Sequence, residues 1–313
     1  MNRNMEYIYA VYTAGSFTEA AKDLYISQPC LSAAVKKVEE QLGVPIFNRT
    51  TKPLTLTEYG RQYIDYLEKL QRLELEFERY LNDVRGLRTG YLSIGANNVF
   101  ASFVLPGLIR SFKSQYPGVQ VNMVEGKIAY LEDALMRGKV DLVLDNCLLD
   151  TGVFAQTCIG TEHLLLAAHK TVKFTDACLT HSDILAGKPT REDVPALPIE
   201  AFADLPLIAL HTGNDTRFRM DSVFQQAQIP PNIQLEVDQL ATAYQIACTG
   251  LNATLVSDTL LYKTPANPDM CYYKLDSNIT TRPIYMYHKR AEHIPMAMQT
   301  FMDMVVTTFG EKT

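Results

Sequence analysis

The sequence of 313 residues predicts a multi-domain fold, in which an all-α-rich N-terminal part is followed by a larger α/β part built from two units. Three observations support this fold class. Short amphipathic segments fill the first ~40 residues, an apolar heptad follows over the next ~30, and strand-like and helix-like segments alternate after Gly90. At about 100–200 residues per domain, the length is sufficient for at least two domains with ordinary cores.

Composition and charge narrow the classes of protein. The net charge of −6 gives no overall support for nucleic-acid binding, so any such binding has to be local. The start, MNRNMEYIYAVYTAG, lacks a long apolar core, and no window of ~18 apolar residues occurs, so we expect neither export nor a membrane span, and a cytoplasmic location. Six scattered cysteines without C-x-x-C favour buried free thiols, with a redox-sensing pair of Cys147 and Cys158 as the alternative.

The first residues predict three short helices. The first runs from Met5 to Ala14; Ser16 is then a good N-cap for the second, and Glu19 completes the capping-box pattern. Ser27 caps the third helix, and Pro29 lies in its first turn, where a missing N–H does little harm. Two short helices joined by about three residues outline a helix-turn-helix.

The third helix has an apolar face and a polar face. The apolar residues recur at spacings of four, three and four, which predicts a face packed inward: Leu31, Val35, Val38 and Leu42. The opposite face combines small residues with charged ones: Pro29, Ser32, Ala33, Lys36, Lys37 and Glu40. Small residues allow the backbone to approach another surface, and lysines can reach phosphates. An ordinary amphipathic surface helix is the alternative interpretation.

The segment FNRTTKPLTLTEYG after this helix predicts a wing. Phe47 is an apolar anchor, the bend from Arg49 to Lys52 is basic and hydroxyl-rich, and residues 54–56 alternate like a short strand. Basic residues in such a bend suit the backbone of a duplex.

An apolar heptad series follows the wing and predicts a long helix with an exposed seam. The series steps alternately by four and three: Tyr59, Tyr63, Tyr66, Leu70, Leu73, Phe77, Tyr80 and Val84. A second copy of the chain is the expected partner for this seam, and packing on the chain's own domain is the alternative. Residues 86–90 form a short, glycine-bounded break.

After Gly90 the chain predicts two α/β units with largely parallel strands. In the first unit we expect strands at 91–95, 119–124 and 140–144 and helices at 99–116 and 129–137. In the second we expect strands at 206–211, 233–237 and 253–257 and helices at 215–227 and 240–249. A returning strand at 283–288 and a closing helix at 295–309 complete the pattern, and 173–202 is expected to be a loop-rich excursion.

The stretch SFTEAAKDLYISQPCLSAAVKKVEEQLGVPIFNRTTKPLTLTEYG closely resembles the winged helix-turn-helix of LysR-type transcriptional regulators. The motifs A-A-x-x-L, S-Q-P-x-L/V-S, L-G-x-P-I/L-F-x-R and L-T-x-x-G occur in the family's order and spacing. Residues 90–310 resemble the family's effector domain by texture and by L-P-x-L at Leu105 and G-x-x-D-L at Gly138.

The resemblance implies a domain organisation and a function. It implies a winged helix-turn-helix at 1–57, a linker and dimerisation helix at 58–86, a hinge at 87–90 and a periplasmic-binding-protein-like effector domain at 91–313. Subdomain I then covers about 91–161 and 268–313, and subdomain II about 162–267. The implied function is transcription regulation, modulated by a small-molecule effector bound between the subdomains. The implied partners are double-stranded DNA and further copies of the chain, as homodimer or homotetramer, without a membrane.

The resemblance also implies DNA-contacting residues. Those that approach base edges are Ser27, Gln28, Pro29 and Ser32, and those that contact phosphates are Lys36, Arg49, Thr50 and Lys52. A glutamine amide can present a donor and an acceptor to adenine in the major groove. One departure is the pair Ala33 and Ala34, where family members often carry polar or basic residues. It shifts the expected readout toward the wing and DNA shape.

The effector site can be placed from the predicted strand ends. Small molecules bind open α/β sheets at the carboxyl ends of strands, against helix N-termini. The candidate residues follow the predicted strands of both units: Asn97, Asn98, Gly126, Lys127, Asp145, His211, Thr212 and Asn214. Lys127 beside a helix N-terminus supports the hypothesis of an anionic effector, whereas Asp145 favours the opposite charge.

Two other classes of function were compared with regulation. A solute-binding protein of the same bilobal fold is the alternative, and the missing apolar leader and the heptad helix weigh against it. G-x-S-x-G, P-loop and H-E-x-x-H motifs are absent from the sequence. We therefore expect no enzyme activity, no catalytic residues, no metal and no cofactor.

Overall fold

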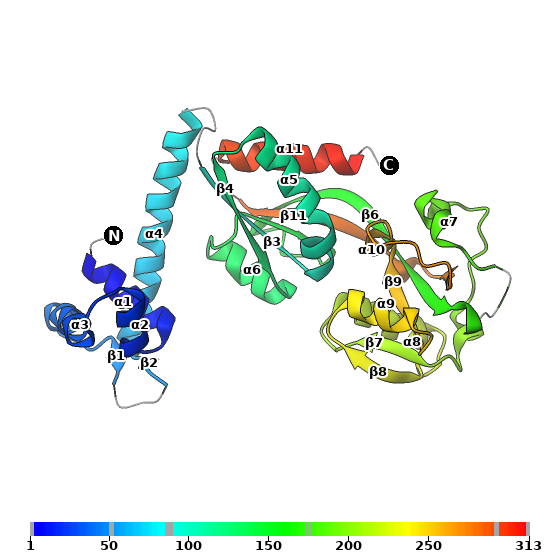
Figure 1. Cartoon of the computed structure of the whole chain (residues 1–313), viewed down its shortest axis with the longest axis horizontal. Helices are drawn as coiled ribbons and strands as arrows, with labels where there is room; N and C mark the ends of the chain where they lie inside the picture. Colours follow the sequence, from blue (N-terminus) through cyan, green and yellow to red (C-terminus); the bar gives the residue numbers. More distant parts are fainter. Residues whose placement is uncertain are drawn as a thin grey trace. The chain divides into compact units, whose positions relative to one another are not determined.

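The computed structural model describes residues 3–49, 53–84, 90–172, 175, 177–290 and 294–310. The chain divides into two compact units, Met1–Val84 and Arg85–Thr313, each with its own core (Figure 1). None of the helices in the described ranges is long and apolar enough to cross a membrane.

The N-terminal unit is a winged helix-turn-helix. Its elements are α1 (Arg3–Ala14), α2 (Phe17–Asp23), α3 (Gln28–Leu42), the antiparallel pair β1 (Phe47–Asn48) and β2 (Thr55–Leu56), and α4 (Glu58–Val84). The predicted N-caps form: Ser16 Oγ accepts hydrogen bonds from the N–H groups of Thr18 and Glu19, and Ser27 Oγ accepts one from Cys30. The predicted capping box forms only in part, because the Glu19 carboxylate bonds Lys22 instead of the backbone of Ser16. Gly43 ends α3 with a φ of +73°, in the left-handed region that favours glycine.

The core of this unit confirms most of the predicted apolar face of α3. Leu31, Val35 and Val38 are buried, but the prediction for Leu42 was wrong, since 44% of its surface is exposed. Leu42 lies in the last turn of α3, beyond the end of the core. Ile64 and Leu67 of α4 are buried in the same core, so the first turns of α4 pack on the chain's own unit.

The second unit is built on one continuous nine-stranded sheet in the order β4-β3-β5-β11-β6-β9-β7-β8, with β10 paired to β6. The first lobe contains β3 (Gly90–Ala96), β4 (Val119–Glu125) and β5 (Leu142–Asp145), with α5 (Leu105–Gln115), α6 (Ile128–Met136) and α11 (Met296–Gly310) around them (Figure 1). The second lobe contains β7 (Leu207–Leu210), β8 (Ile233–Val237) and β9 (Ala253–Ser257), with α8 (Asp215–Gln226), α9 (Leu240–Cys248) and α10 (Asp258–Leu261). Strands β3, β4 and β5 are parallel, as are β7, β8 and β9, which fits the predicted α/β architecture.

Two long strands connect the lobes. Strand β6 (Phe154–His169) pairs through residues 154–163 with β11 (Thr281–Lys289), and through residues 164–169 with β9 and β10 (Met270–Lys274). The sequence pattern did not predict β6 or β10. It also placed the return to the first lobe at residue 268, whereas β10 belongs to the sheet of the second lobe and the chain returns only with β11. Strand β6 passes from β11 to β9 and β10 without a turn in the chain, so no turn signal in the sequence marks the passage from one lobe to the other.

Two further local predictions need correction. The helix expected over 99–116 begins with a π-helical turn, η1 (Phe100–Val104), and becomes α-helical as α5. Pro106 accounts for the change, because it lacks an N–H and its ring excludes the carbonyl four residues earlier. The loop-rich segment expected at 173–202 contains a short helix, α7 (His181–Leu185), whose N-terminus is capped by a Thr180–Asp183 capping box. The break at 86–90 lies outside the described residues, except for Gly90 at the start of β3.

Candidate DNA-binding face and effector cavity

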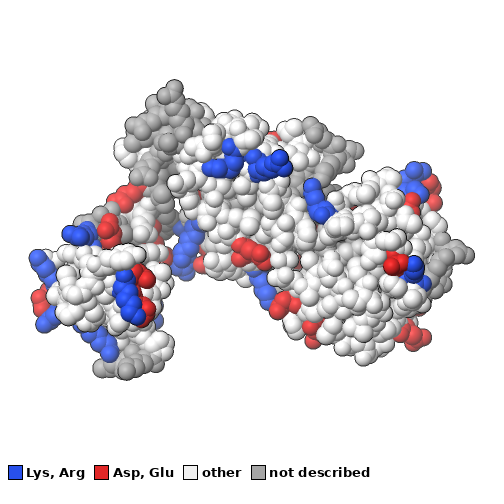
Figure 2. Space-filling model, in the orientation of Figure 1, with Lys and Arg blue, Asp and Glu red and all other residues white. Residues whose placement is uncertain are grey.

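The start of α3 is exposed to solvent. Ser27, Gln28 and Pro29 are exposed at its N-terminus, Ser32 is half-buried one turn later, and Lys36 is exposed beyond it. Among the coloured residues in the view of Figure 2, basic and acidic side chains are interspersed over this unit without an extended patch of one sign. The face shown therefore offers no broad basic surface, in line with the net charge of −6.

Arg49 follows β1, but its side chain lies against α3. Its Nη1 donates to Ser32 Oγ at 3.1 Å, and its Nη2 donates to Glu39 Oε2 at 3.0 Å. The guanidinium carbon also lies 5.0 Å from the centre of the Phe17 ring. Thr50 and Lys52, the other predicted phosphate contacts of the wing, lie outside the described residues.

The heptad seam of α4 is exposed at four positions whose side chains are described: Tyr59 (60%), Tyr66 (46%), Leu73 (61%) and Phe77 (63%). Tyr63 and Leu70 are half-buried, and nothing is described for the side chains of Tyr80 and Val84. Large apolar side chains in such a row are unfavourable in water unless another surface covers them. The helix thus combines an inner face for its own unit with an outer apolar seam.

A cavity of about 490 Å³ lies between the two lobes of the α/β unit. Six of the eight residues predicted from strand ends line it: Asn97, Asn98, Gly126, Lys127, Asp145 and Asn214. His211 and Thr212, also predicted, are not part of the lining. The six predicted residues in the lining are the strand end Asp145 and residues that directly precede or cap a helix: Asn97 and Asn98 before η1, Gly126 and Lys127 before α6, and Asn214 at the N-cap of α8. The prediction failed at His211 and Thr212, which lie in the loop after the end of β7 at Leu210, before the turn residue Gly213 with its φ of +88°.

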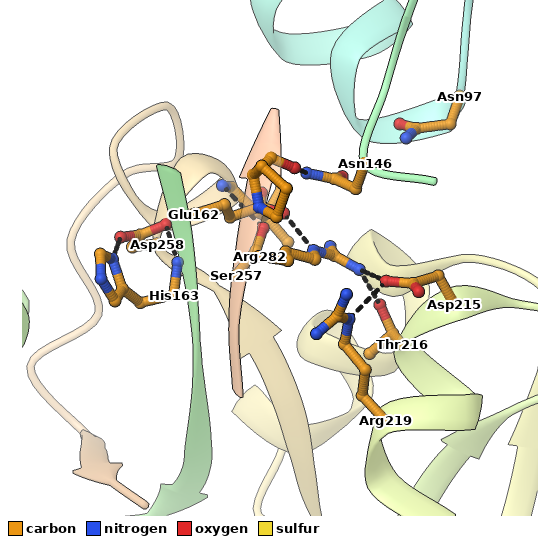
Figure 3. Close-up of polar contacts among 12 residues, drawn as sticks. Asn97, Asn146, Glu162, His163, Asp215, Thr216, Arg219, Ser257, Asp258 and Arg282 are labelled. Atoms are coloured by element: carbon orange, nitrogen blue, oxygen red, sulfur yellow. Dashed lines mark hydrogen bonds and ion pairs between the residues drawn. The ribbon is translucent and has the colours of Figure 1, made fainter. Parts of the chain in front are cut away.

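Arg282, on the connecting strand β11, lines this cavity. Its side chain is only 5% exposed; Nε donates to Glu162 Oε2 and Nη1 to Asp215 Oδ2, both at 2.6 Å (Figure 3). Arg282 lies on β11, Glu162 on the neighbouring β6, and Asp215 at the start of α8 in the second lobe. Burial alone lowers the pKa of Arg282, but the two carboxylates outweigh it, so the pKa lies above its usual value. One guanidinium thus joins both connecting strands to the second lobe.

The cavity lining also contains a buried carboxyl group, that of Asp145 at the end of β5. Its Oδ1 accepts hydrogen bonds from the N–H groups of Asn146 (2.8 Å) and Cys147 (2.9 Å). Burial raises the pKa of Asp145 above its ordinary value, and these donors offset only part of that effect. Burial and the neighbouring Asp145 also raise the pKa of the Cys147 thiol, which disfavours the thiolate that a redox sensor needs.

Acidic side chains outnumber basic ones in the lining: Glu125, Asp145, Asp215 and Asp238 against Lys127 and Arg282. Arg282 is engaged by two carboxylates, whereas Lys127 has no ion-pair partner within the described ranges. Asn98 donates through Nδ2 to Glu125 Oε1 at 2.9 Å, and its carbonyl Oδ1 is buried without a partner among the described groups. A ligand with hydrogen-bond donors would satisfy that carbonyl.

Arg282, Glu162 and Asp215 were not predicted as site residues, although ion pairs of Arg282 with both carboxylates connect them in the structure. Arg282 and Glu162 belong to strands that a pattern of alternating strand and helix does not place at the cavity. A charged residue inside a strand-like run, TRPIYMYH, was the available signal, because such a residue is buried only with a partner.

The class of protein follows from these two sites. A helix-turn-helix with an exposed reading helix, joined to a two-lobed α/β unit with a cavity at the strand ends, is the arrangement of a ligand-responsive DNA-binding protein.

Comparison with known proteins supports this class. The family model described as "LysR substrate binding domain" matches residues 85–310, and that described as "Bacterial regulatory helix-turn-helix protein, lysR family" matches residues 2–61. The chain is 28% identical over 305 residues to YcgK, an uncharacterized HTH-type transcriptional regulator of Bacillus subtilis (strain 168), covering 96% of this chain and 92% of the relative. It is 27% identical over 308 residues to a probable RuBisCO transcriptional regulator of Gracilaria tenuistipitata var. liui, covering 96% and 94%. The crystal structure of full-length CbnR complexed with its target DNA shares the fold, with a TM-score of 0.68, 21% identity, and coverage of 98% of this chain and 100% of that one.

The chain belongs to the LysR family. It is a DNA-binding transcriptional regulator with a domain for a small-molecule effector.

Proposed function

We propose that the chain acts in the cytoplasm as a dimer or tetramer without enzyme activity of its own. In this proposal the exposed face of α3 contacts base edges through Ser27, Gln28, Pro29 and Ser32, with phosphate contacts from Lys36, Arg49, Thr50 and Lys52. The α4 seam from Tyr59 to Val84 holds two copies together. The observation that carries the proposal is an exposed reading helix in the same chain as an interlobe cavity.

Effector binding acts, in this proposal, through the position of the lobes. The cavity walls come from both lobes, and Arg282 connects them through Glu162 and Asp215. A ligand that touches both walls stabilises the arrangement in which both are within reach, and this differential binding is what shifts an equilibrium between arrangements. The proposed domain division at residues 57, 86 and 90 separates reading, coupling and sensing.

DNA binding is tested with the full-length protein and its own upstream intergenic DNA in a gel-shift experiment. A specific complex that weakens steeply with salt is expected, because phosphate contacts release counterions. Gln28→Ala should weaken the specific complex, while Lys113→Ala on α5 of the other unit serves as the control. Absence of any specific, salt-sensitive complex would contradict the proposal.

Oligomerisation is tested by sedimentation of the Phe77→Glu variant. Phe77 is 63% exposed in the single chain, so the charge should leave the monomer intact and disfavour a shared seam. A matched control is Glu74→Gln, an exposed polar position one turn away. An unchanged assembly state for Phe77→Glu would remove the seam from the proposal.

The charge of the effector is tested by calorimetric titration of the full-length protein with a panel of small carboxylates. If the effector is anionic, Lys127→Ala weakens its binding, whereas Arg110→Ala, an exposed position on α5 outside the cavity lining, leaves it unchanged. Lack of binding by the wild type, or binding indifferent to Lys127→Ala, would exclude the anionic hypothesis. A panel of small amines then tests whether the cavity binds a cation instead, as the excess of acidic side chains in its lining suggests.

A further inference from the structure

The contacts of Arg49 point to a role beyond a phosphate contact. The guanidinium meets Ser32 on the reading helix, Glu39 one turn before the end of that helix, and the face of Phe17 on α2. A cation over an aromatic ring and two hydrogen bonds from a planar fork fix both the position and the tilt of the group. With 42% of its side chain exposed, Arg49 is held in place without being buried.

Glu39 is the fixed point of this arrangement. Its side chain is 11% exposed, and its Oε1 accepts hydrogen bonds from the N–H groups of Ile46 (2.8 Å) and Phe47 (3.2 Å) at the start of β1. Its Oε2 accepts the hydrogen bond from Arg49. The same carboxylate therefore ties the first wing strand to α3 and orients the guanidinium that reaches Ser32.

The consequence for Ser32 is chemical. A serine hydroxyl has one donor and two lone pairs, and it rotates to suit its neighbours. When Arg49 Nη1 donates to Ser32 Oγ, one lone pair is occupied and the hydroxyl hydrogen is directed away from the guanidinium. The hydroxyl hydrogen is then available to acceptors on a base edge, such as purine N7, guanine O6 or thymine O4, while only one lone pair is left for an amino donor such as that of cytosine.

We propose that Arg49 is a positioning residue for base readout, which orients the Ser32 hydroxyl through the Phe17–Glu39–Arg49 arrangement. The inference rests on the proposed role of α3 in DNA binding. It differs from the phosphate contact implied by the family resemblance, because a phosphate contact changes affinity for all sequences alike. Ala33 and Ala34, which follow Ser32 on α3, have no polar side-chain atoms for base contacts. The orientation of the Ser32 hydroxyl therefore matters more for base readout.

The experiment uses the full-length protein and synthetic duplexes that the wild type selects from a randomised pool. Each base pair of the selected site is then changed singly, and dissociation constants are measured for the wild type, Ser32→Ala, Arg49→Lys and the double variant. Arg49→Lys keeps the positive charge and loses the planar fork. We expect Ser32→Ala and Arg49→Lys to lose the same base preference, by about 3- to 10-fold, and the double variant to lose no more than either single variant.

Controls separate orientation from charge and from folding. Lys36→Ala removes an exposed lysine of the same helix and should weaken binding to all duplexes and reduce the salt slope by about 1, without altering base preference. Glu39→Gln keeps a carbonyl acceptor for the N–H groups of Ile46 and Phe47 and removes the charge that holds Arg49. It should shift the same base preference as Arg49→Lys while thermal unfolding of the variant remains cooperative.

The outcomes that overturn the inference are specific. If Arg49→Lys preserves the base preference that Ser32→Ala loses, or if Ser32→Ala loses none, Arg49 does not position Ser32. Arg49→Ala, measured on the same duplexes, gives the second test: if it weakens all of them equally and lowers the salt slope by about 1, Arg49 is a phosphate contact only. If the wild type selects no sequence at all, the proposed role of α3 fails before the role of Arg49 is reached.

Discussion

Replacement of Arg282 by methionine removes a buried cation that joins both connecting strands to the second lobe. Glu162, whose side chain is 1% exposed, then keeps a buried carboxylate without its ion-pair partner, and its Oε1 already lacks a hydrogen-bond partner among the described groups. Removing one partner of a buried pair costs about 3–5 kcal/mol, because the remaining charge is uncompensated. Asp215 is less affected, since Arg219 Nε donates to its Oδ2 at 2.8 Å. We therefore expect the free energy of unfolding of the α/β unit to fall by about 3–5 kcal/mol.

Hydrogen exchange measured by mass spectrometry along a urea titration tests this expectation, because peptides of β6 and β11 report on the α/β unit separately from α1–α3. The double variant Arg282→Met with Glu162→Gln should recover much of the loss, since no buried charge remains. Arg191→Met, which breaks an exposed pair with Asp193, is the control and should change little. A loss below about 1 kcal/mol, or a double variant no more stable than Arg282→Met, would refute the reasoning.

Three other substitutions test separate parts of the structure. Asp145→Asn should stabilise the protein at neutral pH, because the raised pKa of Asp145 means that ionisation of this group costs free energy in the folded state. Urea titrations at several pH values test this: the gain in stability over the wild type should shrink as the pH falls through that pKa. Gly60→Ala should destabilise the N-terminal unit by about 1–3 kcal/mol or more in thermal unfolding, because a Cβ there would lie 2.0 Å from the carbonyl oxygen of Ile46; an unchanged midpoint would contradict the packing. Tyr25→Gly should stabilise the helix-turn-helix by about 0.5–1 kcal/mol, since Tyr25 is 96% exposed with a φ of +53°; a loss of stability would show that its ring makes contacts in solution.

The helices of the N-terminal unit could be predicted from the sequence because their caps and apolar spacings are short-range signals. The caps at Ser16 and Ser27 and the spacing of Leu31, Val35 and Val38 act within a few residues, and the structure shows each of them. The predicted burial of Leu42 was wrong because apolar periodicity does not indicate where along a helix the core ends. Arg49 was read only as a charge next to DNA, since its contact with Ser32, seventeen residues earlier, depends on how β1 returns to α3.

In the α/β unit, the sequence by itself determined the alternation of elements and the strand ends that line the cavity, because hydrophobic period and strand polarity are carried by each segment alone. Tertiary structure decided which strands connect the lobes and which charges meet. Glu162 and Arg282 are paired across β6 and β11 although 120 residues separate them, and Asp215 joins them from the second lobe. Consecutive residues of β6 even face different partners, with Glu162 directed to Arg282 and His163 to Asp258 at 2.9 Å (Figure 3). Such pairings depend on sheet register, a long-range property for which no single segment carries a signal.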